Sequence, residues 1–201
     1  NYPFNIDIFE NFREVSLEKP ITILIGENGS GKSTLLAGIA AAAQSITVGK
    51  DSIDYDPSLL AARKLAQYLR LSWKIKTKRG FFLRAEDFIS YTKRINNLKI
   101  ELKQDLIEVE KNYKDKSQFS QNQAKAAYQN SLAAIKNKHG EGLETMSHGE
   151  RFLEFFSMRF VKNGLYILDE PEAPLSPKNQ LVFISMIKQM LQQNAQFIIA
   201  T

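Results

Sequence analysis

The sequence of 201 residues predicts an α/β fold with a mainly parallel β-sheet and a helical insertion. Three observations support this prediction. Short runs of β-branched and other apolar residues, typical of buried parallel strands, recur along the chain. Segments with helical periodicity separate these runs, and such alternation favours a parallel sheet covered by helices. Residues 86–136 contain neither glycine nor proline, which indicates long helices. The length fits one domain, residues 1–201, of which we expect residues 58–147 to be the insertion.

The first third of the chain begins with two segments that we expect to form short antiparallel strands. Residues 4–9 alternate apolar and polar side chains, as a half-buried strand does, and residues 13–17 can supply a second strand. The β-branched run at residues 21–25 predicts a fully buried parallel strand. Two helices are expected next, an alanine-rich one at 33–43 and another at 58–74.

The rest of the chain predicts three further strands and four further helices. Residues 86–136 fit two long helices broken near residues 117–120. Apolar residues at helical spacing predict a stripe that packs against a neighbour, namely Ile95, Leu98, Leu102 and Leu106. We expect a loop at 140–142. The remaining elements are strands at 81–84, 165–168 and 196–200 and helices at 147–161 and 177–193.

The composition excludes several kinds of site. With no cysteine, the chain has no disulfide, thiolate metal site or cysteine nucleophile. With two histidines, we expect neither a histidine-built zinc site nor a Ser-His-Asp triad. No apolar run of about 18 residues and no secretion signal is present, so we expect a cytoplasmic protein without a transmembrane segment. The chain starts without methionine and stops within an apolar run, so we expect part of a longer protein.

The positive charge is concentrated in one part of the chain. The formal net charge is +5, but the segment from Arg63 to Lys116 holds 15 basic and seven acidic residues, a local charge of +8. Such a segment can bind nucleic acid or another polyanion, or it can be the solvated face of a helix. The cluster that we expect to matter most for nucleic acid is Lys74, Lys76, Lys78 and Arg79.

The segment from Gly26 to Ser33 matches the phosphate-binding pattern G-x-x-x-x-G-K-[ST] at every required position. Its glycines let backbone N–H groups converge on phosphate oxygens at a helix N-terminus. Lys32 can reach the β- and γ-phosphates, and the Ser33 hydroxyl can bind Mg²⁺. The residues that we expect around the nucleotide are Gly26, Glu27, Asn28, Gly29, Ser30, Gly31, Lys32, Ser33 and Thr34.

Two carboxylates follow the predicted strand at 165–168, at the edge where open parallel sheets bind ligands. Asp169 can hold Mg²⁺ directly or through water. Glu170 lies one residue further and can act as general base for an attacking water. Together with the phosphate-binding loop, this pair predicts a P-loop NTPase that hydrolyses nucleoside triphosphates.

A third motif precedes an apolar helix and reads Met146-Ser147-His148-Gly149-Glu150. It resembles the signature motif of ABC-type ATPases, usually L-S-G-G-Q, and departs from it at the methionine, the histidine and the glutamate. Residues 171–176 resemble the D-loop that follows in that family.

The resemblance covers both ends of the chain, about residues 4–45 and 143–201. It is closest to soluble, chromosome-maintenance-like (SMC- and RecF-like) ABC ATPases and to small stand-alone ATPases near them. The run at residues 80–86 and the Ser-His-Gly-Glu signature are similar to the stand-alone group.

The resemblance implies that the protein binds ATP with Mg²⁺ and hydrolyses it between two subunits. The amides at Ser147 and Gly149 would bind the γ-phosphate held by another subunit's P-loop, so Ser147 would join Lys32 and Glu170 as a catalytic residue. His148 stands at a variable position of the signature. Hydrolysis would reopen an ATP-dependent homodimer. The family's switch histidine would come just after Thr201.

One position departs from the family pattern. ABC ATPases usually carry a glutamine beside Mg²⁺ after the strand that corresponds to residues 81–84, whereas Arg84 and Glu86 stand near that place here. Either can replace the glutamine, and Glu86 can instead be an ordinary salt-bridge partner. The resemblance also implies an aromatic residue that stacks on adenine. The candidates, most of which we expect to pack in the core, are Tyr2, Phe4, Phe9 and Phe12.

The leading hypothesis is therefore an ATPase that dimerises on ATP and acts on a macromolecule, either nucleic acid such as DNA or a partner protein. One alternative is the nucleotide-binding subunit of an ABC membrane transporter. The missing glutamine, the altered signature and the lysine-rich helical segment disfavour it. Another alternative is a regulatory or toxin-like module that turns ATP over slowly. Stimulation of hydrolysis by DNA, by RNA or by neither separates these hypotheses.

Overall fold

A computed structural model describes residues 2–10, 12–48, 59–139 and 147–201. The chain divides into two compact units, one formed by Asn1–Ile89 with His148–Thr201 and the other by Ser90–Ser147. The elements in chain order are α1 (Asp7–Glu10), β1 (Ile21–Leu24), α2 (Lys32–Ala42), α3 (Leu60–Ala66), β2 (Gly80–Arg84), α4 (Ala85–Asn112), α5 (Gln118–His139), α6 (His148–Arg159), β3 (Leu165–Asp169), α7 (Pro177–Leu191) and β4 (Gln196–Ala200).

The four strands of the described residues form one sheet in the order β1-β4-β3-β2, and every pair is parallel. The predicted α/β fold with a parallel sheet is therefore confirmed. All four strands end at the same edge. At this edge the register places Leu24 beside Ala200, Ala200 beside Asp169 and Asp169 beside Arg84.

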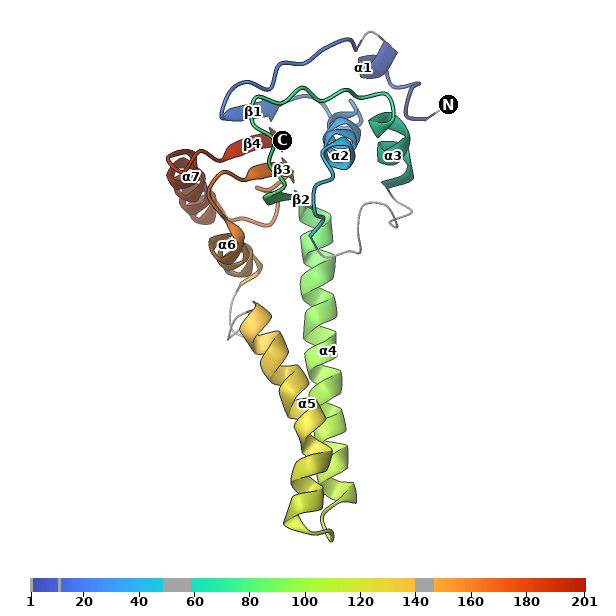
Figure 1. Ribbon diagram of the computed structural model, residues 1–201, viewed down its shortest axis with the longest axis vertical. Coiled ribbons are helices and arrows are strands. Elements are labelled where there is room, and N and C mark those ends of the chain that lie inside the picture. The colour runs from blue at the N-terminus through green and yellow to red at the C-terminus, as the bar shows by residue number, and fades with distance from the viewer. Residues whose placement is uncertain (1, 11, 49–58, 140–146) are drawn as a thin grey trace. The chain divides into compact units, whose positions relative to one another are not determined.

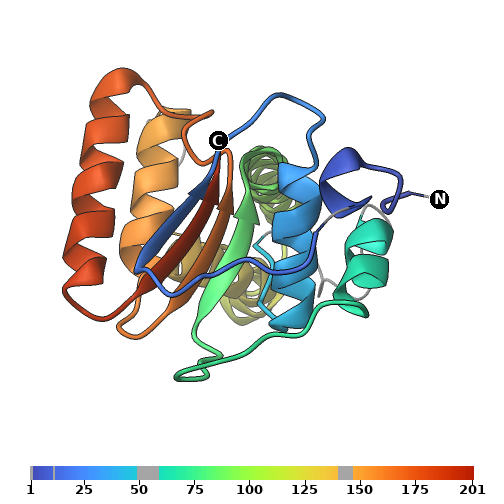
Figure 2. The same cartoon turned by 90° about the horizontal axis from the view of Figure 1, so that it is seen from above.

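Helices cover both faces of the sheet, α6 and α7 on one and α2 and α3 on the other (Figure 2). Successive side chains along each strand point to opposite faces of the sheet, so the core is divided into two parts. Phe81 and Tyr166 pack with α6 and α7, whereas Phe82 and Ile167 pack with α2 and α3. The β3 strand is buried throughout because it lies in the middle of these layers. Helix α7 starts where the Ser176 Oγ accepts a hydrogen bond from the backbone N–H of Asn179, as an N-cap does.

The expected N-terminal antiparallel strands are wrong. Residues 4–9 form turns and the start of α1, and residues 13–17 form no strand. The apolar side chains of residues 4–9 pack against helices and a loop instead of forming one face of a strand. Phe9 packs against the α2–α3 core, while methyl groups of Ile6 and Ile8 lie against the phosphate-binding loop at Gly31. A period-two pattern over only six residues fits a turn with a short helix as well as it fits a strand.

Two further expectations require correction. The strand at residues 21–25 is an edge strand rather than a fully buried one, and Ile23 is 53% exposed. The helix expected at 58–74 is described from Leu60 to Ala66 only. Leu69 and Trp73 pack on the α2–α3 core from a segment without regular structure. The expected loop at 140–142 lies outside the described residues.

The second unit consists mainly of α4 and α5, which run side by side in Figure 1. This confirms two long helices. The break lies at 113–117, slightly before the expected 117–120, and it ends where the Ser117 Oγ accepts a hydrogen bond from the Ser120 N–H. A small cluster of Ile95 and Ile135 joins the two helices, with Leu102 packed against it. Leu98 of the predicted stripe is instead exposed. Within the described residues, every helix is too short or too polar to cross a bilayer.

Candidate active site

The phosphate-binding loop connects β1 to α2 at the carboxyl edge of the sheet. Gly29 and Gly31 have φ values of +83° and +94°, in the left-handed region that favours glycine, and Gly31 is the N-cap of α2. A side chain at Gly31 would also collide with Ile8, whose Cγ2 would lie 2.9 Å from the added Cβ. The loop therefore depends on glycine for both its conformation and its packing.

The ammonium group of Lys32 lies against the loop itself. Its Nζ donates hydrogen bonds to the carbonyl oxygens of Gly26 at 2.6 Å and Glu27 at 3.0 Å. Lys32 is 9% exposed, so the positive charge is held close to the loop backbone. Gly26 thus contributes a carbonyl acceptor, while Gly29 and Gly31 contribute the left-handed turns.

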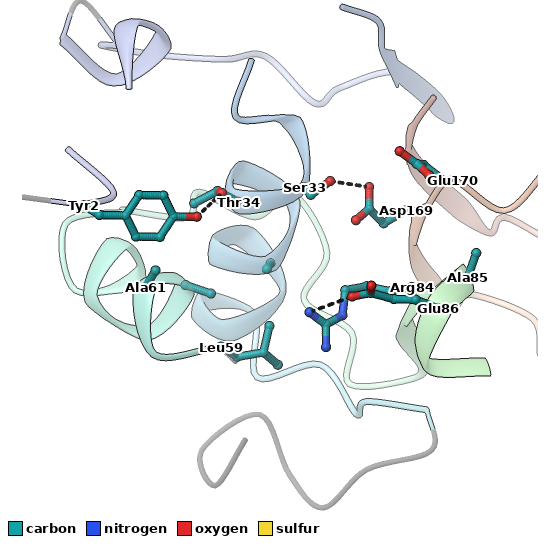
Figure 3. A pocket seen from close by; sticks show the side chains of 12 residues that line it. Tyr2, Ser33, Thr34, Leu59, Ala61, Arg84, Ala85, Glu86, Asp169 and Glu170 are labelled. Atoms are coloured by element: carbon teal, nitrogen blue, oxygen red, sulfur yellow. Dashed lines mark hydrogen bonds and ion pairs between the residues drawn. The ribbon is translucent and has the colours of Figure 1, made fainter. Parts of the chain in front are cut away.

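The structure brings Ser33 and Asp169 together although 136 residues separate them in the sequence. The Ser33 Oγ donates a hydrogen bond of 3.0 Å to the Asp169 Oδ1 (Figure 3). Burial raises the pKa of the Asp169 carboxyl above its ordinary value, and the nearby Glu170 raises it further. The hydrogen bond from Ser33 and the charge of Arg84 act in the opposite direction. Burial outweighs these two influences, so the pKa of Asp169 is raised and its charged form is disfavoured in the folded protein.

The Ser33 and Asp169 oxygens fit a magnesium ion. Both are hard oxygen donors, the kind of ligand that magnesium takes in proteins, and they lie 3.0 Å apart. The described residues hold no cluster of three or more His, Cys, Asp or Glu side chains suited to a metal. Few protein ligands are the rule for magnesium in phosphate-binding sites, where phosphate and water supply the others.

Replacement of Asp169 by asparagine should stabilise the protein in the absence of nucleotide and magnesium. Since the folded-state pKa is raised, the ionised carboxylate lowers stability above the ordinary pKa of about 4. The Asp169→Asn variant should therefore melt at a higher temperature than the wild type at pH 7. The difference should shrink as the pH falls toward 4, because Asp169 then becomes neutral.

Asp87→Asn is a control for which we expect the opposite change in stability. Asp87 is also buried, at 4% exposure, but its Oδ2 accepts a charge-assisted hydrogen bond from Arg84, so neutralising it should destabilise the protein. Thermal melting of both variants at pH 7 and pH 5 tests the assignment. Equal destabilisation by the two substitutions would contradict the expected cost of the Asp169 charge.

Glu170 directly follows β3 and has a φ of +49°, which is unusual for a residue other than glycine. The other described non-glycine residues with positive φ are Gln44, Asn163 and Asn194. The Glu170 N–H donates to the Ala200 carbonyl at 2.9 Å, so the strained residue is tied to β4. Its exposed side chain lines a cavity of about 260 Å³ together with Ser33 and Asp169.

Arg84 and Glu86 line the same cavity, although they are distant from Ser33 in the sequence (Figure 3). The Arg84 Nε donates a hydrogen bond of 2.5 Å to the Asp87 Oδ2, and its Nη1 lies 3.4 Å from the Glu86 Oε1. Both residues near the place of the missing glutamine therefore face the site. Asp87 was not predicted as a site residue. Its three-residue spacing from Arg84 near the start of a helix is the only signal that could have indicated it.

Of the four aromatic candidates, Tyr2 alone lines this cavity, and its hydroxyl lies 3.0 Å from the Thr34 Oγ1. Phe4 makes an edge contact with Tyr68, whereas Phe9 and Phe12 pack against the α2–α3 core. A second cavity, of about 730 Å³, is lined by Ile6, Ile8, Asn5, residues 23–26, Gly29, Ser30, Lys32 and Leu35.

The third motif leads into α6, which begins at His148 immediately after Ser147. Gly149 is buried and packs tightly. A Cβ added there would lie 2.7 Å from the Asn179 Nδ2 and 3.2 Å from the Pro174 carbonyl oxygen. Glycine at this position therefore lets the first turn of α6 approach residues 174–179, which include part of the segment that resembles a D-loop.

Comparison with known proteins agrees with this geometry. The family model described as the RecF/RecN/SMC N terminal domain matches residues 4–201, nearly the whole chain. No curated protein and no solved structure matches it. The resemblance to SMC- and RecF-like ATPases is thereby confirmed, whereas the suggested relation to small stand-alone ATPases stays a prediction. The chain belongs to the RecF/RecN/SMC N-terminal domain family of ABC-type P-loop ATPases.

Proposed function

We propose that the protein binds ATP and hydrolyses it to ADP and phosphate in a magnesium-dependent reaction. The observation that carries this proposal is the Ser33–Asp169 hydrogen bond of 3.0 Å, which joins the phosphate-binding loop to the acidic end of β3. Membership of an ATPase family supports the same conclusion. The proposed unit is one ATPase domain with a helical insertion, acting in the cytoplasm.

Each residue has a role that follows from its chemistry. The loop amides from Gly26 to Thr34 and the Lys32 ammonium bind the β- and γ-phosphates. Ser33 and Asp169 hold magnesium, which when bound neutralises charge on the phosphate oxygens. Glu170 accepts a proton from the water that attacks the γ-phosphorus, while the bond from this phosphorus to the β–γ bridging oxygen breaks. Tyr2, beside Thr34, is the proposed partner of the adenine ring.

Replacement of Lys32 by alanine tests nucleotide chemistry at this loop. Loss of the ammonium should lower the rate of ATP hydrolysis by about 100-fold or more, because a donor aimed at the transferring phosphate is removed. The control is Lys162→Ala, which removes an exposed lysine outside the site. Phosphate release with and without magnesium is the measurement. Hydrolysis that is independent of Lys32 or of magnesium would contradict the proposal.

We further propose that two copies enclose two ATP molecules. In this arrangement the amides at Ser147 and Gly149, at the N-terminus of the 12-residue helix α6, bind the γ-phosphate held by the other copy. Close packing of Gly149 against Pro174 supports a shared role for the signature and the D-loop-like segment.

The proposed macromolecular partner is nucleic acid, DNA in particular, and the support is electrostatic. The segment from Arg63 to Arg84, both included, holds eight basic residues and no acidic residue. The cluster of Lys74, Lys76, Lys78 and Arg79 is exposed and precedes β2, at the edge of the sheet opposite the nucleotide site. Exposed apolar side chains at Tyr68 and Ile75 lie in the same segment and can contact bases.

Replacing the four basic residues of this cluster by glutamine should weaken DNA binding and flatten its salt dependence. Each lost phosphate contact lowers the slope of log K against log salt by about 0.9, so the slope should fall by about 2 to 4. A matched variant neutralises four other exposed lysines, Lys19, Lys162, Lys178 and Lys188. Equal slopes for the two variants would rule out this cluster. Stimulation of ATP hydrolysis by DNA, but not by RNA, would support a DNA-directed ATPase.

A further inference from the structure

The position of Arg84 in the sheet brings a cation directly beside the proposed magnesium ligand. Arg84 is the last residue of β2 and stands in register with Asp169, the last residue of β3. Neighbouring parallel strands lie about 4.8 Å apart, so this register makes the two residues immediate neighbours at the carboxyl edge.

The guanidinium group is held on one side by a buried carboxylate. The Arg84 side chain is 11% exposed and that of Asp87 is 4% exposed, and the Nε–Oδ2 separation is 2.5 Å. Such a short contact between charged groups in a buried setting fixes the plane of the guanidinium. Because α4 begins at Ala85, its first turn carries Asp87 and thereby positions the Arg84 side chain.

The contact on the other side is much weaker. The Arg84 Nη1 lies 3.4 Å from the Glu86 Oε1, and the Glu86 side chain is 76% exposed. An exposed ion pair at this distance contributes little stability. Giving up the Glu86 contact in favour of a phosphoryl oxygen therefore costs little stability.

Arg84 lines the same cavity as the residues that we propose to act on the terminal phosphate. Its polar lining combines Arg84 with the hydroxyls of Ser33 and Thr34 and with the carboxylates of Glu86, Asp169 and Glu170 (Figure 3). Among the described residues, Arg84 is the only cationic side chain in this lining, and Lys32 lines the second cavity. Arg84 therefore adds positive charge close to the three carboxylates of this cavity.

We propose that Arg84 is a catalytic residue that binds the γ-phosphate of ATP in the same subunit and that Asp87 is its positioning residue. The inference rests on the proposed ATPase function and extends it. The Arg84 guanidinium stands where ABC ATPases usually carry the neutral side chain of a glutamine. It adds a fixed positive charge where negative charge is redistributed during hydrolysis. Glu86 is the residue that leaves the guanidinium when the phosphate binds.

The test measures binding as well as turnover. Affinities for MgADP and for the Mg²⁺ complex of AMP-PNP are determined by calorimetry for the wild type, Arg84→Lys and Asp87→Asn. A double variant, Arg84→Gln with Asp87→Asn, avoids a buried carboxylate without its partner. The matched control is Lys125→Gln, which removes a partly buried cation paired at 3.1 Å with Glu110 in the second unit. Melting temperatures confirm that each variant is folded.

The double variant should bind AMP-PNP about 10- to 100-fold more weakly, while its affinity for ADP stays within about twofold of the wild type. Its kcat should fall by about 100-fold or more. Arg84→Lys should recover part of the AMP-PNP affinity, because charge remains but the planar fork is lost. Asp87→Asn should lower kcat with ADP binding unchanged.

The inference is overturned if the double variant binds AMP-PNP and turns over ATP like the Lys125→Gln control. It is also overturned if ADP and AMP-PNP affinities fall together, since this indicates a purely structural ion pair. A wild-type protein that binds neither nucleotide would instead refute the proposed function itself, which keeps the two failures distinct.

Discussion

Replacing Glu170 by glutamine is expected to stop ATP turnover and to trap a dimer with ATP bound. The side chain is exposed in the cavity beside Asp169, and its backbone is held in a left-handed conformation by the end of β3. Glutamine keeps the size of the side chain but cannot accept the proton of the attacking water. Loss of a general base lowers the rate by about 10²- to 10⁴-fold. Phosphate release under single-turnover conditions measures the loss.

The solution mass of the same variant tests the two-subunit arrangement. With ATP and magnesium the mass should double, whereas with ADP it should remain that of the monomer. Light scattering gives the mass, and a second variant provides the control. Ser147→Arg in the Glu170→Gln background introduces a long side chain at the start of α6 and should leave the protein monomeric. If Glu170→Gln binds ATP as a monomer, the role proposed for Ser147 and Gly149 is wrong.

Replacing Gly80 by alanine is expected to cause the largest loss of stability of any substitution considered. Gly80 is the first residue of β2 and has a φ of +103°. An added Cβ would lie 1.9 Å from the Leu165 carbonyl oxygen and 2.7 Å from the Leu165 backbone nitrogen. These atoms belong to the neighbouring strand and cannot move aside without breaking the β2–β3 pairing. We expect a loss of more than about 3 kcal/mol in the free energy of unfolding.

Gly29→Ala measures the cost of a left-handed backbone alone, without the overlap of an added Cβ with a neighbouring strand. Gly29 also has a left-handed backbone, with a φ of +83°, but no described atom lies within 4 Å of its added Cβ. Its substitution should cost about 1–2 kcal/mol, the strain of the left-handed conformation. Urea unfolding of both variants provides the comparison. Equal losses would mean that the close approach of β2 to Leu165 does not matter.

Because β2 ends at Arg84, the Gly80→Ala substitution should also impair the site at a distance. Misplaced pairing at Gly80 shifts the register that puts Arg84 beside Asp169. The ATP-dependent contacts proposed for Arg84 should therefore be lost together with stability. Gly29→Ala does not alter this register.

Local patterns predicted most of the strands and helices. The runs at 165–168 and 196–200 are strands because their apolar residues are buried between two helical layers. The segment at residues 86–136 forms two helices because no glycine or proline interrupts it and polar residues cover most of its length. The prediction of N-terminal strands was wrong because the segment at residues 4–9 is short and its apolar side chains pack from a turn and the start of α1.

The same contrast applies to the site. The phosphate-binding loop and the Asp169–Glu170 pair were recognisable because glycine spacing and strand-terminal acids are local features. The places of Arg84 and Glu86 were left open, and Asp87 was not considered, because their relation to Ser33 depends on which strands are neighbours. Burial of the Asp87 side chain against Arg84 depends on the packing around the start of α4.

The sequence by itself therefore determined the P-loop ATPase family and the alternation of strands and helices, since both depend on residues that are close along the chain. Only the tertiary structure decided the strand order β1-β4-β3-β2, and with it the meeting of Ser33, Asp169 and Arg84 at one edge. The physical reason is that strand order follows from the burial of both faces of the sheet at once, which no local pattern encodes.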